Sequence, residues 1–167
     1  MNPYNQRGVT LIEVMIGIAI AGIIFQIILS FYIFGSRAFN LGEVQSDLQN
    51  KTRIAARSLT KELRYAKELR ILPEVPDPIT SDWGYIFVND DSFIEYRDKD
   101  SSRIILNGSG NSGFQISFEV KDSPRILCFK ITCSSGTRSY EIESEVLLLN
   151  LDTIDGSDNG TVVGFKL

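Results

Sequence analysis

Residues 6–34 read QRGVTLIEVMIGIAIAGIIFQIILSFYIF, and this stretch decides how the rest of the chain is interpreted. Between Val9 and Phe34 the only strongly polar side chains are those of Glu13 and Gln26. About 20 apolar residues span a bilayer as a helix, so the stretch is long enough to cross a membrane. A carboxylate costs about 2.5–3.5 kcal/mol near the bilayer centre, and the presence of Glu13 therefore needs an explanation.

Two ordinary interpretations compete for this stretch. A secretory signal peptide has an apolar core of only about 7–15 residues and ends in an A-x-A-like cleavage site. The best such site here is the poor match Ser36-Arg37-Ala38. A plain membrane anchor fits the length, and it leaves Glu13 as an unexplained acid near the membrane edge, where the energetic cost is lower.

The residues around Glu13 resemble the processing site of type IV prepilins and pseudopilins. A short polar leader ends in Gln6-Arg7-Gly8, and Val9-Thr10-Leu11-Ile12-Glu13 follows, with Glu13 at the fifth position after the glycine. The resemblance implies that a membrane prepilin peptidase cleaves between Gly8 and Val9 on the cytoplasmic side and methylates the new amine of Val9. The family favours Phe where this chain has Val9.

The resemblance also gives Glu13 a role in assembly. Cleavage creates a cation, the α-amino group of Val9, and helices that pack side by side bring it near a neighbouring subunit's Glu13. A carboxylate in a medium of low dielectric constant is tolerated when it meets such a cation. We therefore expect Glu13 to set the register between subunits.

The helix is predicted to continue through residues 35–72 as an amphipathic half, until Pro73 and two further prolines end it. Apolar residues recur there at helical spacing, at Leu41, Val44, Leu48, Ala55, Leu59, Leu63, Ala66 and Leu69. A basic ridge runs beside this stripe and is either a solvated face or a contact with the acidic head of a neighbouring subunit. It comprises Arg53, Arg57, Lys61 and Arg64.

Residues 73–167 are predicted to form a β-sheet head, because the apolar period changes to two. The expected strands are 85–88, 93–97, 103–107, 114–120, 125–133, 138–149 and 161–167, with turns at 89–91 and 134–137. In 138–149, Glu141, Glu143 and Glu145 should face solvent, while Tyr140, Ile142, Val146 and Leu148 should face the core. The fold class is therefore α+β, with a leader (1–8), a transmembrane and polymerisation helix (9–34), its amphipathic half (35–72) and an antiparallel head (73–167), as in pilins.

Composition excludes several classes of function. Residues 35–70 hold eight Lys and Arg against four Asp and Glu, and residues 71–167 hold eight against sixteen, so no nucleic-acid partner is expected. The chain has no histidine, which removes the commonest general base and metal ligand, and no enzymatic activity is expected. Cys128 and Cys133 are interpreted as unpaired core residues on opposite sides of a strand, with pairing across a bulge as the alternative.

Residues 155–160 resemble part of a calcium-binding loop. DGSDNG matches the first, third, fifth and sixth positions of such a loop, but Lys166 stands where a bidentate Glu is needed. A solvated turn is therefore the main interpretation, and no cofactor is expected. Some pseudopilins hold calcium in a C-terminal loop, so Asp152, Asp155 and Asp158 are the weak candidates for a calcium site.

Together these features predict a structural subunit of a type IV pilus-like or type II secretion-like filament. Residues 139–150 resemble the C-terminal hydrophobic strand of PilW-type minor pilins and J-type pseudopilins, and Ser30 replaces the proline usual in major pilins. The expected partners are other pilin or pseudopilin subunits, the prepilin peptidase, an inner-membrane assembly platform and the membrane. The precursor is expected in the inner membrane and the mature subunit in an extracellular or periplasmic filament. The alternative function is a single-pass anchored β-domain that binds a ligand or partner.

Overall fold

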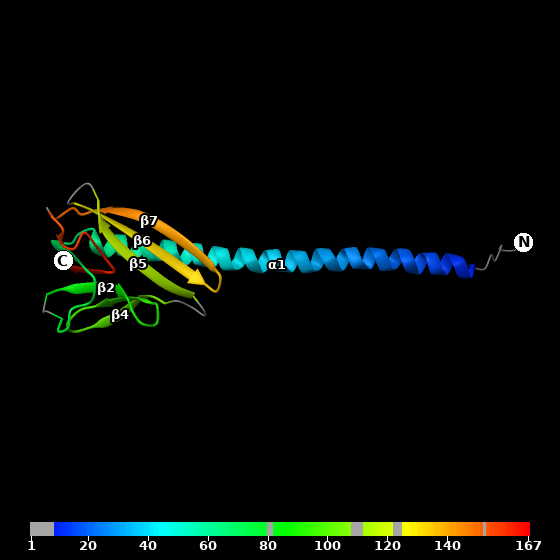
Figure 1. The fold of residues 1–167 in the computed structure, drawn as a ribbon, viewed down its shortest axis with the longest axis horizontal. Helices are drawn as coiled ribbons and strands as arrows, with labels where there is room; N and C mark the ends of the chain where they lie inside the picture. Colours follow the sequence, from blue (N-terminus) through cyan, green and yellow to red (C-terminus); the bar gives the residue numbers. More distant parts are fainter. Residues whose placement is uncertain (1–8, 80–81, 108–111, 122–124, 152) are drawn as a thin grey trace, which may run out of the picture. The chain divides into compact units, whose positions relative to one another are not determined.

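The computed structural model describes residues 9–79, 82–107, 112–121, 125–151 and 153–167. These residues form one long helix, α1 (Leu11–Leu63), and a set of strands (Figure 1). The strands are β1 (Glu68–Leu72), β2 (Gly84–Val88), β3 (Ile94–Arg97), β4 (Ser102–Leu106), β5 (Ser112–Val120), β6 (Ile126–Ser135), β7 (Arg138–Leu147), β8 (Asp155–Gly156), β9 (Asn159–Gly160) and β10 (Val162–Lys166). The chain divides into two compact units, of which the first ends at Glu43 and the second runs from Val44 to Leu167.

The first unit contains the N-terminal part of α1. This part has no proline to interrupt its backbone hydrogen bonds, and the helix continues through all four of its glycines. Each of these glycines faces open space, because a Cβ atom there would have no neighbour within 4 Å outside the adjacent helix backbone. Ser30 donates its hydroxyl hydrogen bond to the carbonyl oxygen of Gln26 (2.9 Å), which satisfies the hydroxyl within the helix.

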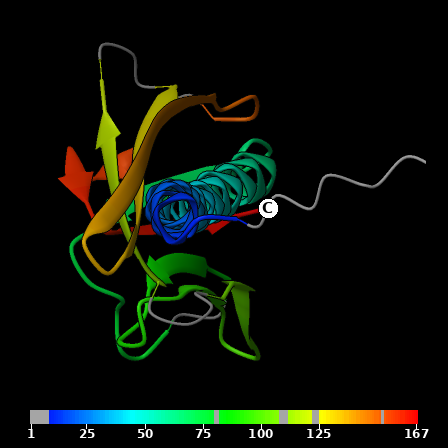
Figure 2. The same cartoon turned by 90° about the vertical axis from the view of Figure 1, so that its right-hand side faces the viewer.

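The second unit is built around the remaining turns of α1. A stripe of this segment is buried, comprising Leu48, Thr52, Ala55, Leu59 and Leu63. The stripe joins one hydrophobic core with residues of both sheets, among them Ile86, Phe118, Phe129, Val146 and Phe165. Figure 2 shows the green strands on one side of the helix and the yellow and orange strands on another. The helix is therefore the shared centre of this unit.

The strands form two sheets, where the sequence predicted one. One sheet has the order β4-β3-β2-β10-β1-β8 and the other has the order β7-β6-β5-β9. All pairings are antiparallel except that of β8, which pairs with β1 in parallel through two residues. The predicted α+β class, a long helix packed on antiparallel β-structure, is confirmed, and the head is divided between two sheets.

The C-terminal strand lies inside the larger sheet. β10 pairs with β1 on one side, with Leu69 opposite Phe165, and with β2 on the other, with Ile86 opposite Val163. The outer face of this sheet carries a second, smaller apolar cluster formed by Tyr85, Phe87 and Val162 with residues of the proline-rich connector such as Val75 and Ile79. The connector is therefore packed on the sheet, which explains why β2 is buried on both faces.

The prediction that the helix extends to Leu72 is wrong over its last nine residues. α1 ends at Leu63, and residues 68–72 form β1. The spacing of Leu63, Ala66 and Leu69 fits a helix, but Leu69 and Ile71 also alternate as a strand requires, and pairing with β10 decides between the two. Carbonyl groups at the helix end accept hydrogen bonds from the segment after β7, Arg64 from Leu149 N (3.1 Å) and Tyr65 from Asn150 Nδ2 (3.1 Å).

The other predicted strands are confirmed to within two residues at each boundary. In β7 and the residue after it, Val146 and Leu148 are buried and Tyr140 and Ile142 half-buried, while the three glutamates are exposed. The predicted turn at residues 134–137 joins β6 to β7, and Gly136 has the positive φ (57°) that such a turn favours. At the turn beginning at Asn89, Phe93 N donates to Asn89 Oδ1 (2.9 Å).

Candidate processing and assembly site

The N-terminus of α1 is closed by a capping box. Thr10 precedes the helix, and its hydroxyl oxygen accepts a hydrogen bond from Glu13 N (3.4 Å). In return, Glu13 Oε2 accepts hydrogen bonds from Thr10 N (2.9 Å) and from Thr10 Oγ1 (2.9 Å). The carboxylate thus pairs an amide that would otherwise lack a partner in the helix, and it also lies at the positive end of the helix dipole.

This arrangement gives Glu13 a structural role within one chain. The pattern Thr10-x-x-Glu13 ahead of an apolar run is itself a capping-box signature, so this cap could be recognised from the sequence. All the hydrogen bonds that described residues donate to this carboxylate go to Oε2. The described residues therefore leave Oε1 without a hydrogen bond, and the cap and the predicted pairing with an amine are compatible.

The surface around the cap is apolar and uncovered. Val9 is 74% exposed, and the large apolar side chains from Leu11 to Phe34 are also exposed. A helix that is hydrophobic on all sides belongs in a membrane or among other helices. α1 contains a segment long and apolar enough to cross a membrane, and none of that segment is buried.

The predicted cleavage site is only partly within the described residues. Gly8 lies outside them, whereas Val9 is described and is followed by Thr10 and the first helical turn. The predicted scissile bond, between Gly8 and Val9, is therefore described only on its Val9 side. Cleavage at Gly8, methylation of Val9 and the role of Glu13 in register stay predictions.

Only two of the three weak calcium candidates lie among the described residues. Asp152 lies outside them, while Asp155 is in β8 and Asp158 lies between β8 and β9, both exposed. In the described part of the chain, no group of three or more His, Cys, Asp or Glu side chains could hold a metal ion.

The glycines of the same segment have a structural explanation. Gly156 has φ of 98°, and a Cβ atom at Gly160 would lie 2.5 Å from the carbonyl oxygen of Leu72. β8 pairs with β1 in one sheet, and β9 pairs with β5 in the other. The glycine-rich segment is thus the place where the chain passes closely from one sheet to the other.

Cys128 and Cys133 are both buried and both free, as predicted. Burial raises the pKa of each thiol, so the thiolate form is disfavoured. Neither cysteine is therefore activated as a nucleophile.

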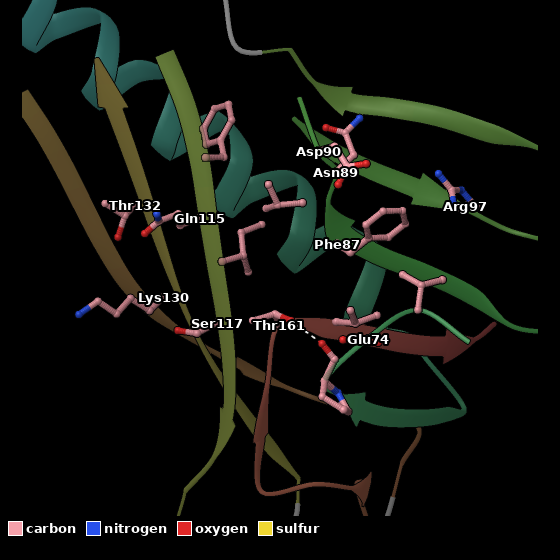
Figure 3. Close-up of a pocket in the computed structure, with 16 residues that line it drawn as sticks. Glu74, Phe87, Asn89, Asp90, Arg97, Gln115, Ser117, Lys130, Thr132 and Thr161 are labelled. Carbon is pink, nitrogen blue, oxygen red and sulfur yellow. Dashed lines mark hydrogen bonds between the residues drawn. The ribbon is translucent and has the colours of Figure 1, made fainter. Parts of the chain in front are cut away.

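A groove of about 780 Å³ opens in the head between the two sheets. Figure 3 shows residues from β2, β5 and β6 and from the segment before β10 around it. Two of its charged side chains form ion pairs: Lys130 with Glu141 (2.7 Å) and Arg97 with Glu95 (2.7 Å). The Arg97 guanidinium also lies 4.9 Å from the centre of the Phe87 ring. Two further residues that line the groove are joined by a hydrogen bond, which Thr161 Oγ1 donates to the carbonyl oxygen of Pro73 (2.8 Å).

Glu95 is a buried carboxylate that the sequence did not reveal. It is 5% exposed and accepts hydrogen bonds from Ser102 Oγ (2.7 Å), Asn89 Nδ2 (3.1 Å) and Arg97 Nε and Nη2 (2.9 and 2.7 Å). Burial alone raises the pKa of this carboxyl, but the hydrogen bonds and the Arg97 charge outweigh it and lower the pKa below 4.5. Glu95 thereby holds together β3, β4 and the turn after β2.

Comparison with known proteins identifies the N-terminal region. Residues 3–25 match the family model described as the prokaryotic N-terminal methylation motif. No curated protein and no solved structure matches the chain. This motif is the one carried by the type IV pilin and pseudopilin family, and here it leads into a long helix packed on antiparallel sheets, which is a pilin-like fold. Proteins of that family are generally structural and not enzymes.

Proposed function

We propose that the protein is a structural subunit of a type IV pilus-like or type II secretion-like filament. The observation that carries the proposal is the methylation motif at the start of a helix whose apolar surface is uncovered. The precursor is held in the inner membrane by residues 9–34, and a prepilin peptidase cleaves it between Gly8 and Val9. The mature chain then joins other subunits through the same helix, in a filament outside the inner membrane that an assembly platform builds.

The proposed assembly contact follows from the charges at the new N-terminus. Cleavage leaves the α-amino group of Val9 as a cation, and its neighbourhood is apolar. Glu13 Oε1 in an adjacent helix is the matching anion, since Oε2 is already used by the cap of its own helix. A charge pair of this kind is worth more in a medium of low dielectric constant than in water, so it favours one axial register between helices.

Two features support a minor pilin or a pseudopilin as the kind of subunit. Ser30 stands where major pilins usually carry a proline, and the helix continues through it. Residues 139–150, which resemble the C-terminal hydrophobic strand of PilW-type minor pilins and J-type pseudopilins, contain most of the edge strand β7.

The test is to determine the mass and the N-terminal peptide of the protein extracted from the membranes of a host with an active prepilin peptidase. We expect a chain that starts at N-methylated Val9. A start at Met1, or beyond Ala38, would refute the proposal.

A variant pair sharpens this test. Glu13→Gln removes the charge but keeps the size of the side chain, and Glu43→Gln, at another exposed position of α1, is the matched control. We expect Glu13→Gln to be absent from sheared filaments while Glu43→Gln is retained. Equal recovery of both variants would rule out a role for Glu13 in assembly.

The head groove supports a second candidate function, an anchored binding module. Its volume of about 780 Å³ is within the range of ligand sites. This function predicts an unprocessed chain that starts at Met1. It also predicts that Glu13→Gln changes neither the amount of protein in the membrane nor the binding of its ligand or partner. The same mass measurement therefore distinguishes the two functions.

A further inference from the structure

The exposed face of α1 in the head unit carries a regular row of side chains that continues into the turn after the helix. Arg53, Arg57 and Lys61 lie on the helix and Tyr65 lies two residues beyond its end; they follow one another at steps of four residues, and all four are exposed. The row lies on the side of the helix opposite the buried stripe, because residues four apart share a face. Within the described residues, none of the three cations makes an ion pair.

The outward face of β7 carries a row of opposite charge. Glu141, Glu143 and Glu145 alternate with inward-facing side chains and are exposed. Leu147 (54% exposed) and Leu149 (52% exposed) continue in the same sequence. β7 is an edge strand of its sheet, so this row borders open space.

Two lysines partly neutralise the glutamate row within the chain. Lys130 pairs with Glu141 (2.7 Å) and Lys121 pairs with Glu143 (3.1 Å), while Glu145 has no ion pair among the described residues. All of these side chains are about half exposed or more, and such surface pairs are worth only about 0–1 kcal/mol. They can be exchanged for new partners at little cost.

The two rows have matching spacing. Four residues of helix advance by about 6 Å, and two residues of strand advance by about 6.8 Å. Over three steps, the lengths of the helix row and the strand row therefore differ by only about 2 Å. Long arginine and lysine side chains can adjust to this difference. When the rows run in the same direction, three cations meet three carboxylates and Tyr65 meets Leu147.

A single chain cannot bring its own rows together. Val146 and Leu148 of the β7 segment point into the core that the buried stripe of α1 also lines, so the outward glutamates point away from the helix. The basic row likewise points away from that core. If the rows meet, they meet between two copies.

The direction of the two rows within one chain also favours such a contact. Lys51 Nζ donates to Ser112 Oγ (3.1 Å), and Ser112 lies opposite Ser135, the partner of Arg138 at the start of β7. Beyond the end of β7, Leu149 N donates to the carbonyl oxygen of Arg64 (3.1 Å). β7 and this part of α1 therefore run in the same direction (Figure 1). Copies that share one orientation, as filament subunits do, would present the two rows in parallel.

We propose that the row Arg53, Arg57, Lys61 and Tyr65 of one copy docks along the row Glu141, Glu143, Glu145 and Leu147 of a second copy. The contact is head-to-tail, because it joins two different surfaces of the same unit and so repeats from copy to copy. This inference rests on the proposed function, because a filament is what aligns the copies.

Cysteine cross-linking of the full chain in native membranes tests the contact. Cells produce two versions together, one with Arg57→Cys and one with Glu143→Cys, and the membranes are oxidised mildly. We expect a disulfide-linked dimer of the two versions, and a dimer also for Arg53→Cys with Glu141→Cys. The control pair Arg57→Cys with Lys99→Cys, an exposed loop residue outside both rows, should give none.

Charge exchange provides an independent readout. A chain with Arg53→Glu, Arg57→Glu and Lys61→Glu should lose the dimer, and so should a chain with Glu141→Lys, Glu143→Lys and Glu145→Lys. A chain with all six changes should regain it, when the cross-link is placed at Tyr65→Cys and Leu147→Cys throughout. Near-UV circular dichroism of each variant shows that the head is folded.

The outcomes separate this inference from the proposed function. No dimer, a dimer that survives either reversal, or a cross-link to a different protein would overturn the docking of two copies. N-terminal masses are measured on the same membranes: methylated Val9 without the dimer refutes only the docking. The dimer with an uncleaved Met1 start refutes the proposed processing and leaves the contact established.

Discussion

The two parts of α1 have the same backbone conformation and opposite surroundings. Up to Glu43 the helix exposes isoleucines, leucines and phenylalanines on all sides, whereas from Val44 onward one stripe is buried and the opposite face is basic. Helical conformation is thus common to both parts, and the arrangement of apolar side chains around the helix decides what each part contacts. The first part has the surface of a segment for lipid or other helices, and the second has the surface of a domain core.

Two carboxylates, one at the start of α1 and one in β3 of the head, show a similar difference. Glu13 is exposed at the start of the helix and is held by one residue, Thr10. Glu95 is buried in the head and is held by donors from three different parts of the chain. Loss of the first should be a local event, and loss of the second should affect the whole head unit.

The largest expected effect is from Leu59→Ala, which removes a fully buried side chain of the stripe. We expect the head to lose about 2–5 kcal/mol of unfolding free energy, since a cavity is left in the core. Ile24→Ala, at an exposed position of the first part of the helix, is the control and should change it by less than about 0.5 kcal/mol. Urea unfolding of the detergent-solubilised chain, followed by near-UV circular dichroism, measures both. Equal losses would show that the two parts of α1 are not energetically distinct.

A smaller effect, with a defined pH dependence, is expected for Glu95→Gln. The variant should lose about 1–3 kcal/mol at pH 7, because an amide cannot accept from all the donors that surround the carboxylate. The pKa of Glu95 is lower in the folded state, so its contribution is complete above pH 4.5 and is lost as the pH falls through the lowered pKa.

Unfolding of the wild type and Glu95→Gln at a series of pH values checks this dependence. The difference between them should shrink below pH 4.5, while Glu119→Gln, an exposed strand residue, should match the wild type throughout. A constant difference down to strongly acidic pH would contradict the assigned pKa direction.

The smallest expected effect is from Thr10→Ala. Loss of the cap should destabilise the first helical turn by about 1 kcal/mol and leave the head unchanged. Hydrogen exchange of the purified chain in lipid nanodiscs should be faster at the amides of residues 11–14 and unaltered in β2, β5 and β6. Faster exchange in those strands would mean that the helix start and the head unfold together.

The sequence predicted best what depends on neighbouring residues. The methylation motif is contiguous, and the long strands β5, β6 and β7 alternate visibly, so both could be identified from local pattern. β1 was predicted to be helical because Leu69 fits both the helical and the strand period of apolar residues. Only pairing with the distant β10 makes this segment a strand. β8 and β9 have two residues each and exist only through their partners.

The same distinction applies to the sites. Gly8, Val9 and Glu13 lie within six residues, and their pattern could be recognised without a structure. The environment of Glu95 is assembled from Asn89, Arg97 and Ser102 across a turn and two strands. No spacing rule connects these residues, since the register between β3 and β4 shifts at Ile94 and Glu95.

The position of β10 between β1 and β2 has a consequence for biogenesis. During synthesis, β1 and β2 leave the ribosome long before residues 162–166, which form β10. Until then the larger sheet lacks its central strand, and two strand edges remain open to unwanted pairing. The head therefore completes its fold only after β10 has been synthesised, and a chaperone that shields open strand edges is what such an intermediate would need.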